Sequence, residues 1–219
     1  MFGSKVLKVL PAFVLLAGMA CASSVKVAPP AVDEPQAQTG TQESVVLSGG
    51  CFWGVQAVFQ RINGVISATS GYAGGSASTA QYETVSTGET GHAESVKVVF
   101  DPSRITFGQL LQVFFSVVHD PTELNRQGPD EGTQYRSAIF YTTDQQKKVA
   151  EAYIAQLDQA KAFHGRIVTQ VNQLKGFYPA EGYHQNYYSN HPESLYIQYN
   201  DKPKVAALKK EFPQLYVEK

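Results

Sequence analysis

Cysteine is scarce in this chain of 219 residues, which contains two, Cys21 and Cys51. No cysteine follows Cys51, and Cys21 falls in an N-terminal stretch that is processed under either interpretation given below, so a disulfide within the folded domain is excluded. Blocks of like charge are also absent, and the formal net charge is −1. Neither nucleic acid nor an anionic membrane surface is therefore indicated as a partner. Beyond the N-terminus, no run approaches the roughly 20 apolar residues of a transmembrane helix.

The first residues have the layout of a secretory signal peptide. Lys5 and Lys8 precede an apolar run over residues 9–17, and small residues follow. This pattern predicts a signal peptide over residues 1–22 and a mature protein that is exported, periplasmic or secreted. Alternatively, Cys21 is the lipidated first residue of a membrane-anchored lipoprotein, although the residues before it match a lipobox only in part.

The next segment predicts a linker ahead of one domain. Residues 23–43 contain three prolines among Ala, Gln, Thr and acidic residues, without helical or strand periodicity. This composition is typical of a flexible tether. Residues 44–219 are enough for one compact domain with a substantial core.

Cys51 stands in the most informative stretch, Gly50-Cys51-Phe52-Trp53-Gly54, which holds the only tryptophan. Residues 44–48 predict a short buried strand, residues 49–50 a tight turn and residues 55–61 a helix. A thiol at a helix N-terminus experiences the positive end of the helix dipole, which favours the reactive thiolate. A buried structural cysteine is the alternative. The surrounding glycines and aromatic residues favour a nucleophile.

Glu94 is the candidate acid. In the strand predicted over residues 92–101, Val96, Val98 and Phe100 share the apolar face, and counting back by two places Glu94 on it. Burial without a cationic partner raises the pKa of a carboxyl group, so Glu94 could stay protonated near neutral pH and act as a general acid. If the strand end frays, Glu94 turns out to solvent instead.

The remaining pattern interleaves helices and strands, which indicates an α/β or α+β sandwich. Expected strands cover residues 137–141 and 167–174, expected helices cover 105–118, 144–160 and 202–212, and expected loops cover 71–75 and 121–135. The segment 176–191 is unusually aromatic. It also contains His184 and His191, but their spacing matches no metal-ligand pair, so no metal site is predicted. The glycines of residues 71–75 do not match a nucleotide-binding loop.

Several motifs, taken together, resemble peptide methionine sulfoxide reductase of the A class. They are Gly50–Gly54, Gly71–Gly75, Gly91–Glu94, Phe115–Thr122, Asn125–Gly128, Asp130, Gln134–Ser137 and Ala180–Gln185. The resemblance runs from about Val45 to Tyr199. It implies a two-layer α/β (α+β) sandwich with a mixed sheet and flanking helices in one domain.

The resemblance also implies a mechanism. Cys51 attacks the sulfoxide sulfur, Glu94 protonates the oxygen, and Cys51 becomes a sulfenic acid. Tyr82, Tyr135 and Asp130 match the family's remaining catalytic residues: the hydroxyl donors and the aspartate that organises the site. The expected substrate-binding residues, which hold the methyl group and select the S epimer, are Phe52, Trp53, Tyr82, Tyr135, His184 and Tyr187.

One departure from the family concerns reduction of the sulfenic acid. Many members carry further cysteines toward the C-terminus, and this chain has none. We therefore expect no bound cofactor and an external thiol as reductant, either a small molecule or a thioredoxin- or glutaredoxin-like protein. Alternatively, Cys21 is the resolving thiol and reaches the sulfenic acid of Cys51 through the flexible tether. The expected substrate is methionine sulfoxide in exported proteins and peptides, and we expect a monomer.

Two other functions fit parts of the sequence. A thiol hydrolase would use Cys51 as nucleophile and His92 or His184 as base, but it leaves Glu94 and Trp53 unexplained. An interaction domain would instead display the aromatic residues between Tyr183 and Tyr188 as a binding surface.

Overall fold

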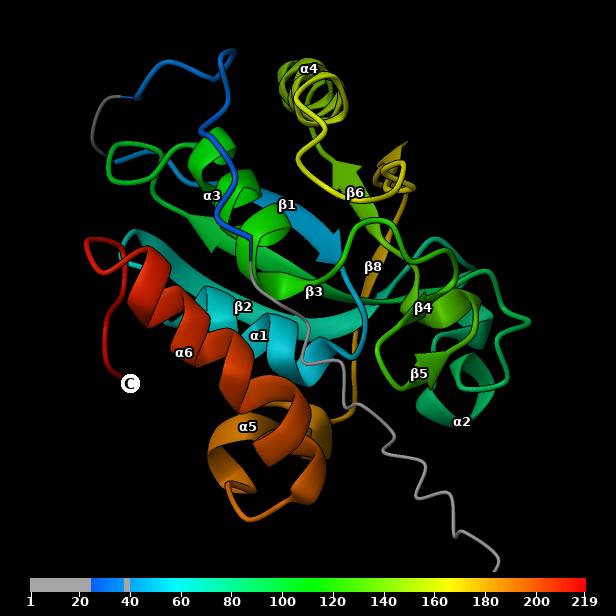
Figure 1. Ribbon diagram of the computed structural model, residues 1–219. Helices are drawn as coiled ribbons and strands as arrows, with labels where there is room; N and C mark the ends of the chain where they lie inside the picture. Colours follow the sequence, from blue (N-terminus) through cyan, green and yellow to red (C-terminus); the bar gives the residue numbers. More distant parts are fainter. Residues whose placement is uncertain (1–24, 38–39) are drawn as a thin grey trace, which may run out of the picture.

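The computed structural model describes residues 25–37 and 40–219, and it is built on one large mixed sheet (Figure 1). The strand order is β7-β6-β1-β3-β2-β8. Neighbouring strands are antiparallel except β6 and β7, which are parallel. The strands are β1 (Glu43–Ser48), β2 (Val65–Ala73), β3 (Ala93–Phe100), β6 (Ala138–Tyr141), β7 (Gln170–Gln173) and β8 (Phe177–Pro179).

The longer helices form a second layer on the sheet. They are α1 (Phe52–Gln60), α3 (Phe107–Val113), α4 (Asp144–Gln159) and α6 (Lys202–Glu211), with the short helices α2 (Tyr82–Val85) and α5 (Tyr187–Asn190). Buried residues of all four longer helices belong to one hydrophobic cluster with inward residues of the sheet. The expected two-layer sandwich with a mixed sheet is thus confirmed.

The core follows the alternation of side chains along β1. Val45 and Leu47 join the main cluster under the helices, whereas Val46 faces a smaller cluster on the other side of the sheet with Phe140. Period-two alternation explains this division, because successive strand residues point to opposite faces. Both faces exclude water at these positions, since all three β1 residues are fully buried.

The helix expected over residues 105–118 has two parts. Thr106 and Gln109 form a capping box at the start of α3. The chain then winds as a π-helical turn, η2 (Phe114–Val118). A second π-turn, η5 (Ile197–Asp201), precedes α6, and such turns are frequent at functional sites.

Residues 71–75, expected to be a loop, belong in large part to β2. This strand continues through Gly71 to Ala73 and is paired with β3 on one side and β8 on the other. Glycine is needed at position 71, because an added Cβ would lie 2.4 Å from the Phe177 ring and from the Tyr178 carbonyl. The strand ends where Gly74 adopts a positive φ of 98°.

Other boundaries also differ from those predicted. The expected loop over residues 121–135 contains a small ribbon of β4 (Arg126–Gln127) and β5 (Asp130–Glu131), followed by the 3₁₀ turn η3 (Thr133–Tyr135). The strand expected over residues 167–174 is restricted to β7. The first helix begins at Phe52 rather than at Val55, so Cys51 occupies its N-cap position.

Residues 25–37 lie in an extended conformation against the domain, and we call them the N-terminal strap. Val27 is buried, and its N–H donates to Ser116 Oγ at 3.2 Å. Tyr153 donates its hydroxyl to the Ala28 carbonyl at 2.6 Å, and Gly108 N donates to Asp33 Oδ1 at 2.8 Å. The composition predicted a flexible linker over residues 23–43, but the strap within it is hydrogen-bonded to η2, α3 and α4.

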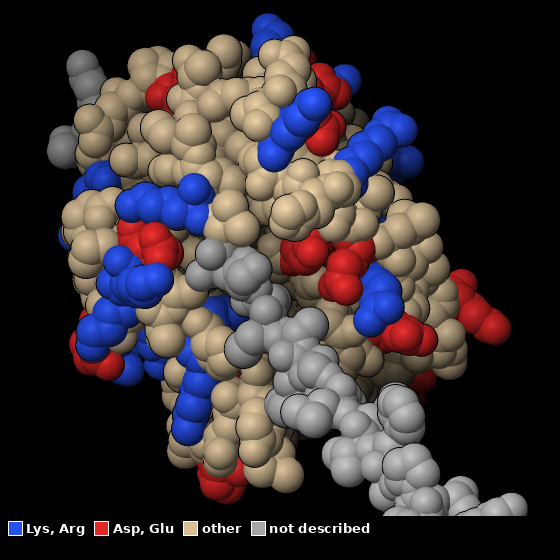
Figure 2. All heavy atoms as spheres, in the orientation of Figure 1, with Lys and Arg blue, Asp and Glu red and all other residues tan. Residues whose placement is uncertain are grey.

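Charged side chains of both signs are interspersed over the face seen in Figure 2, with Lys and Arg most frequent over α6. Three lysines of that helix are paired with acidic groups, Lys204 with Asp201 at 3.5 Å, Lys209 with Glu218 at 3.3 Å and Lys210 with Glu211 at 3.1 Å. Within the described ranges, none of the helices has the length and apolar character needed to cross a bilayer.

Candidate active site

The thiol of Cys51 lies at the N-terminus of α1, directly after the turn at Gly50. Gly50 has a positive φ of 89°, and a Cβ there would lie 2.7 Å from the Gln127 side chain. Both facts require glycine at this position. Cys51 is 7% exposed, and the Trp53 backbone N–H donates a hydrogen bond to its sulfur. The turn thus presents the thiol to the free N–H groups of the helix.

Glu94 reaches the same point from β3. Its side chain is 3% exposed and lies on the strand face that carries Val96 and Val98, as the alternation predicts. Phe52 N donates a 3.1 Å hydrogen bond to Oε2, and the carboxyl group also hydrogen-bonds with the Cys51 thiol. Burial raises the pKa of Glu94 to about 8, with the Phe52 N–H opposing the shift. Glu94 is therefore protonated in most molecules at neutral pH.

The thiol itself differs from the sequence-based expectation. The helix N-terminus predicted a lowered pKa, but burial raises the pKa of Cys51 well above its usual value, and the carboxylates of Glu94 and Asp201 add to the rise. Desolvation of the anion thus outweighs the helix dipole and the Trp53 N–H. The resting thiol is protonated, and loss of the charge on Glu94 removes part of the opposition to the thiolate.

The thiol and Glu94 open into a cavity of about 180 Å³. Its walls are Cys51, Phe52, Trp53, Tyr82, Glu94, Asp130, Tyr135 and Tyr196. Seven of these were expected from the sequence. His184 and Tyr187 do not line the cavity but contact Trp53 from outside it, since the Tyr187 ring stacks on the indole with centroids 3.7 Å apart.

Two tyrosine hydroxyl groups face this cavity from different elements. Tyr82 comes from α2, whose first N–H donates to Glu181 Oε1 at 2.9 Å, and Tyr135 comes from η3. Burial raises the pKa of both tyrosines, and the charge of Glu94 raises it further. Both hydroxyls therefore keep their protons at neutral pH and can donate hydrogen bonds to a polar oxygen in the cavity.

A small cavity with a thiol, a protonated carboxyl group, hydroxyl donors and aromatic walls suits a small polar group attached to an apolar one. Residues 43–216 match the model of a family described as peptide methionine sulfoxide reductase. The chain belongs to this family. By this membership it is an oxidoreductase of the methionine sulfoxide reductase type.

Individual relatives of this reductase agree. It is 59% identical over 177 residues to "Peptide methionine sulfoxide reductase MsrA 2" of Mesorhizobium japonicum, which covers 81% of this chain and 91% of that one. It is 49% identical to the protein of the same name from Synechocystis sp., with 78% and 79% covered. Among solved structures, methionine sulfoxide reductase A of Corynebacterium diphtheriae has a TM-score of 0.61 at 34% identity, covering 79% of this chain and 90% of that one. Reduced Mxr1 from Saccharomyces cerevisiae has a TM-score of 0.63 at 34% identity, with 70% and 88% covered.

Sequence reasoning missed two residues of the reductase site. Tyr196 directly precedes η5, and Asp201 is the last residue of η5. Tyr196 lines the cavity, donates its hydroxyl to Asp130 and meets the Trp53 ring edge-on at 5.6 Å. Asp201 is fully buried and lies 3.5 Å from Lys204 Nζ. It packs so closely on α1 that a Cβ at Gly54 would lie 2.1 Å from its Oδ1. A π-turn far along the chain has no periodicity that could have revealed these contacts.

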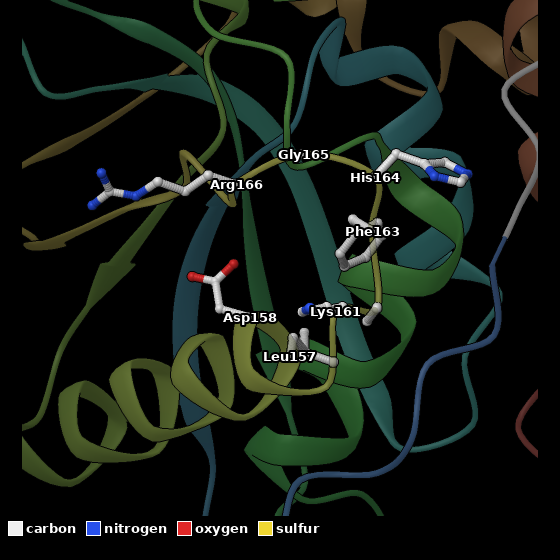
Figure 3. A pocket seen from close by; sticks show the side chains of 8 residues that line it. Leu157, Asp158, Lys161, Phe163, His164, Gly165 and Arg166 are labelled. Atoms are coloured by element: carbon white, nitrogen blue, oxygen red, sulfur yellow. The ribbon is translucent and has the colours of Figure 1, made fainter.

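A larger hollow of about 340 Å³ lies elsewhere, in the loop after α4 of the reductase. Figure 3 shows that two of its basic side chains, His164 and Arg166, point to opposite sides, away from each other. They do not converge on a common ligand. Within residues 25–37 and 40–219, no three His, Cys, Asp or Glu side chains are grouped so as to hold a metal ion.

Proposed function

We propose that this reductase converts methionine S-sulfoxide, free and in proteins, to methionine, with Cys51 as nucleophile and Glu94 as general acid. The observation that carries the proposal is the placement of both groups at the floor of one small cavity, joined by hydrogen bonds at the first turn of α1. A thiol hydrolase would need a histidine base at the thiol, and the cavity walls include no histidine among the described residues.

The chemical step transfers one oxygen and two electrons. The Cys51 thiolate attacks the sulfoxide sulfur, and Glu94 protonates the sulfoxide oxygen. The attack forms a bond between the two sulfur atoms. The hydroxyl group then passes from the substrate sulfur to Cys51 Sγ, the bond between the sulfur atoms breaks, methionine leaves, and Cys51 becomes a sulfenic acid. Cys51 is oxidised by two electrons and the sulfoxide is reduced by two. The Glu94 carboxylate then regains the proton that the thiol released.

The protonation state of Glu94 supports its role as the acid, whereas the resting thiol must lose its proton before it attacks. In the reactive state the pair carries one proton, which lies on Glu94 rather than on Cys51. The raised pKa of Glu94, about 8, favours a protonated carboxyl group at neutral pH. The Trp53 N–H and the helix N-terminus then stabilise the thiolate next to a neutral group instead of a carboxylate.

The cavity walls supply orientation. Tyr82 and Tyr135 donate hydrogen bonds to the sulfoxide oxygen, and Asp130, fixed by Tyr196, organises the polar side. Phe52 and Trp53 bind the terminal methyl group on the opposite side. Exchange of the oxygen and the lone pair would direct the oxygen away from the donors, so the site should accept one epimer, which the family resemblance identifies as the S epimer.

The sulfenic acid must be reduced by a thiol from outside the domain, because Cys51 is the only cysteine in the described part of the chain. A first thiol forms a mixed disulfide with Cys51 and releases water. A second thiol displaces Cys51 and leaves the reductant as a disulfide. A thioredoxin- or glutaredoxin-like protein or a small thiol fits this role.

The N-terminal sequence supports repair of oxidised proteins outside the cytoplasm. Residues 1–22, which resemble a signal peptide, lie outside the described residues, as does the alternative anchor Cys21. Fractionation of cells that produce the full chain, with a Cys21→Ala variant, tests export and lipidation. Retention of the unprocessed chain in the cytoplasm would overturn this part of the proposal.

The activity is tested with dabsylated methionine S-sulfoxide and dithiothreitol. We expect turnover by the wild type, none by Cys51→Ser, and none of the R epimer by either. Folding of the variant is checked by circular dichroism. A fully active Cys51→Ser variant, or product formation without consumption of thiol, would exclude the mechanism.

The route of reduction is tested by one turnover without reductant, followed by trapping with dimedone and mass spectrometry. We expect one sulfenic acid adduct at Cys51. A disulfide between Cys21 and Cys51 in the mature protein would instead assign the reduction to the chain itself.

A further inference from the structure

Trp53 and His184 form a hydrogen bond whose direction is fixed by chemistry. Trp53 Nε1 lies 3.1 Å from His184 Nδ1. An indole N–H can only donate, so Nδ1 must be the acceptor and carries no proton. The proton of the neutral imidazole is therefore on Nε2.

The surroundings of His184 leave this hydrogen bond as its main polar contact. The residue is 2% exposed, and its Nε2 is buried without a hydrogen-bond partner among the described residues. The ring lies between aromatic side chains, 5.0 Å from the Phe52 centroid and 4.4 Å from that of Tyr82. An unpaired buried donor is costly, and the Nε2–H of His184 carries this cost. The hydrogen bond that Nδ1 accepts from Trp53 is therefore the polar contact that justifies a histidine here.

The hydrogen bond restrains a motion of the indole that stacking leaves free. Tyr187 lies parallel to the Trp53 ring, with an interplanar angle of 9°, and Tyr196 meets it edge-on at 87°. Parallel stacking resists tilting of the indole but allows it to slide and rotate in its own plane. The bond to Nδ1 fixes the direction of the N–H vector and therefore the in-plane position.

The turn that carries His184 is itself firmly held. It is the 3₁₀ turn η4 (Gly182–His184), preceded by Glu181, which accepts from Tyr72 OH at 2.8 Å and from the N–H of Tyr82. Gln185 on its other side bonds to Gln56 at 2.9 Å and to Ser70. One short segment thus fixes Tyr82 and Trp53, two walls of the cavity, against each other.

We propose that His184 is a positioning residue: its neutral imidazole, protonated on Nε2, fixes the Trp53 indole and thereby the wall against which the substrate methyl group binds. The statement about the substrate rests on the proposed function, whereas the state of the Trp53–His184 pair does not. Protonation of His184 would place two N–H donors face to face, so the imidazolium form cannot keep this bond and releases the indole.

The electrostatic environment keeps the ring neutral under ordinary conditions. Burial lowers the pKa of His184 below its usual value of 6.5, and the Glu181 carboxylate partly opposes this. From α1 the ring meets the uncharged Phe52 and Trp53, and from α2 and its own turn it meets Tyr82 and Tyr183. Release of the indole is therefore expected only in acid.

Fluorescence tests the pair directly, because Trp53 is the only tryptophan of the chain. We expect its emission to change in acid as His184 becomes a cation and the indole loses its acceptor. His184→Asn keeps an oxygen at the position of Nδ1 and does not titrate, so this variant should lose the transition. The matched control is His191→Asn, which removes the histidine whose tilted ring lies 4.1 Å from that of Tyr187 and should keep the acid transition. A transition that persists in His184→Asn, or disappears in His191→Asn, would overturn the assignment.

Kinetics test the consequence for substrate binding. His184→Phe keeps a ring but removes the acceptor, and we expect KM for dabsylated methionine S-sulfoxide to rise about three- to tenfold, as for loss of one neutral hydrogen bond, with kcat nearly unchanged. His184→Asn should restore KM and remove its rise in acid. A wild-type KM in His184→Phe would exclude the positioning role. Absence of any reductase activity in the wild type would instead contradict the proposed function and leave the fluorescence result standing.

Discussion

The backbone N–H of Phe52 donates a 3.1 Å hydrogen bond to Oε2 of Glu94, and this bond joins the first turn of α1 to β3. Phe52, which follows Cys51 in the chain, therefore holds the Glu94 carboxyl group that faces the Cys51 thiol. Together with the hydrogen bond between the Cys51 thiol and the carboxyl group, this contact keeps the two groups next to each other.

The first prediction concerns the rate of the chemical step. Glu94→Gln keeps an acceptor for Phe52 N but has no proton to transfer at neutral pH, so the rate should fall by about 100-fold or more. In the wild type, the rate should rise with pH up to about 8 and level off above it, because the doubly protonated pair gives way there to the pair that carries one proton. Single-turnover formation of the sulfenic acid, measured across pH, tests both statements. Glu94→Gln should lack the break near pH 8 and lose least in acid; an unchanged break in the variant would assign it to another group.

The second prediction is that Glu94→Gln, which lowers the rate, raises the stability of the folded protein. Folding raises the pKa of Glu94 from 4.5 to about 8, so the folded state binds a proton more tightly than the unfolded state. The destabilisation is absent below pH 4.5, grows between these values and is complete above pH 8. Glu94→Gln should therefore unfold less readily at alkaline pH, by on the order of 5 kcal/mol. Urea denaturation at acid and alkaline pH measures this difference. Equal stability of the two proteins at alkaline pH would contradict the burial of a charged carboxylate.

The third prediction concerns Asp201, whose charge raises the pKa of Cys51. Burial raises the pKa of Asp201 itself to about 6, so it is charged above that pH. Asp201→Asn removes the charge with little change in shape and should shift the pH profile of Cys51 alkylation by iodoacetamide toward lower pH. Glu151→Gln, which changes an exposed carboxylate paired with Lys147 on α4, is the control and should leave the profile in place. A shift toward higher pH in Asp201→Asn would show that its structural role dominates.

The fourth prediction concerns the N-terminal strap. Asp33 accepts hydrogen bonds from Gly108 N and from the Thr106 hydroxyl at the start of α3. Asp33→Ala removes these acceptors at a helix N-terminus and should lower the free energy of unfolding by about 0.5–2 kcal/mol. Because Asp33 does not line the cavity, kcat/KM should be unchanged. Asp33→Asn, which keeps an acceptor, should recover most of the stability. A loss of activity without loss of stability would contradict a purely structural role.

The sequence predicted what is local or periodic. Cys51 follows a glycine turn and starts a helix, and Glu94 shares the face of Val96 and Val98, so both placements could be inferred from neighbouring residues. β2 could not be inferred, since Gly71 and two serines make it resemble a loop. Its strand conformation depends on pairing with β3 and β8, which bring their hydrogen-bonding groups from elsewhere in the chain.

The protonation state of Cys51 illustrates a second reason why the sequence alone does not predict the whole site. The helix N-terminus that favours a thiolate is visible in the sequence. The burial and the carboxylates that oppose the effect of the helix N-terminus come from β3 and from η5. Asp201 of η5 lies well over a hundred residues further along the chain than Cys51. Local electrostatics gave the wrong direction for the pKa of Cys51 because the larger contributions are tertiary.

The N-terminal strap also determines how the domain responds to mechanical load. Tension applied to the chain ahead of Val25 acts first on the bond of Lys26 to the Glu211 carbonyl, next on those of Val27, Ala28 and Ala31, and then on those of Asp33. These bonds would break one after another, as in peeling, before any force reaches β1. Neither α1 nor β3 belongs to the strap. A load on the N-terminus would therefore break hydrogen bonds of the strap and leave the geometry of Cys51 and Glu94 unchanged.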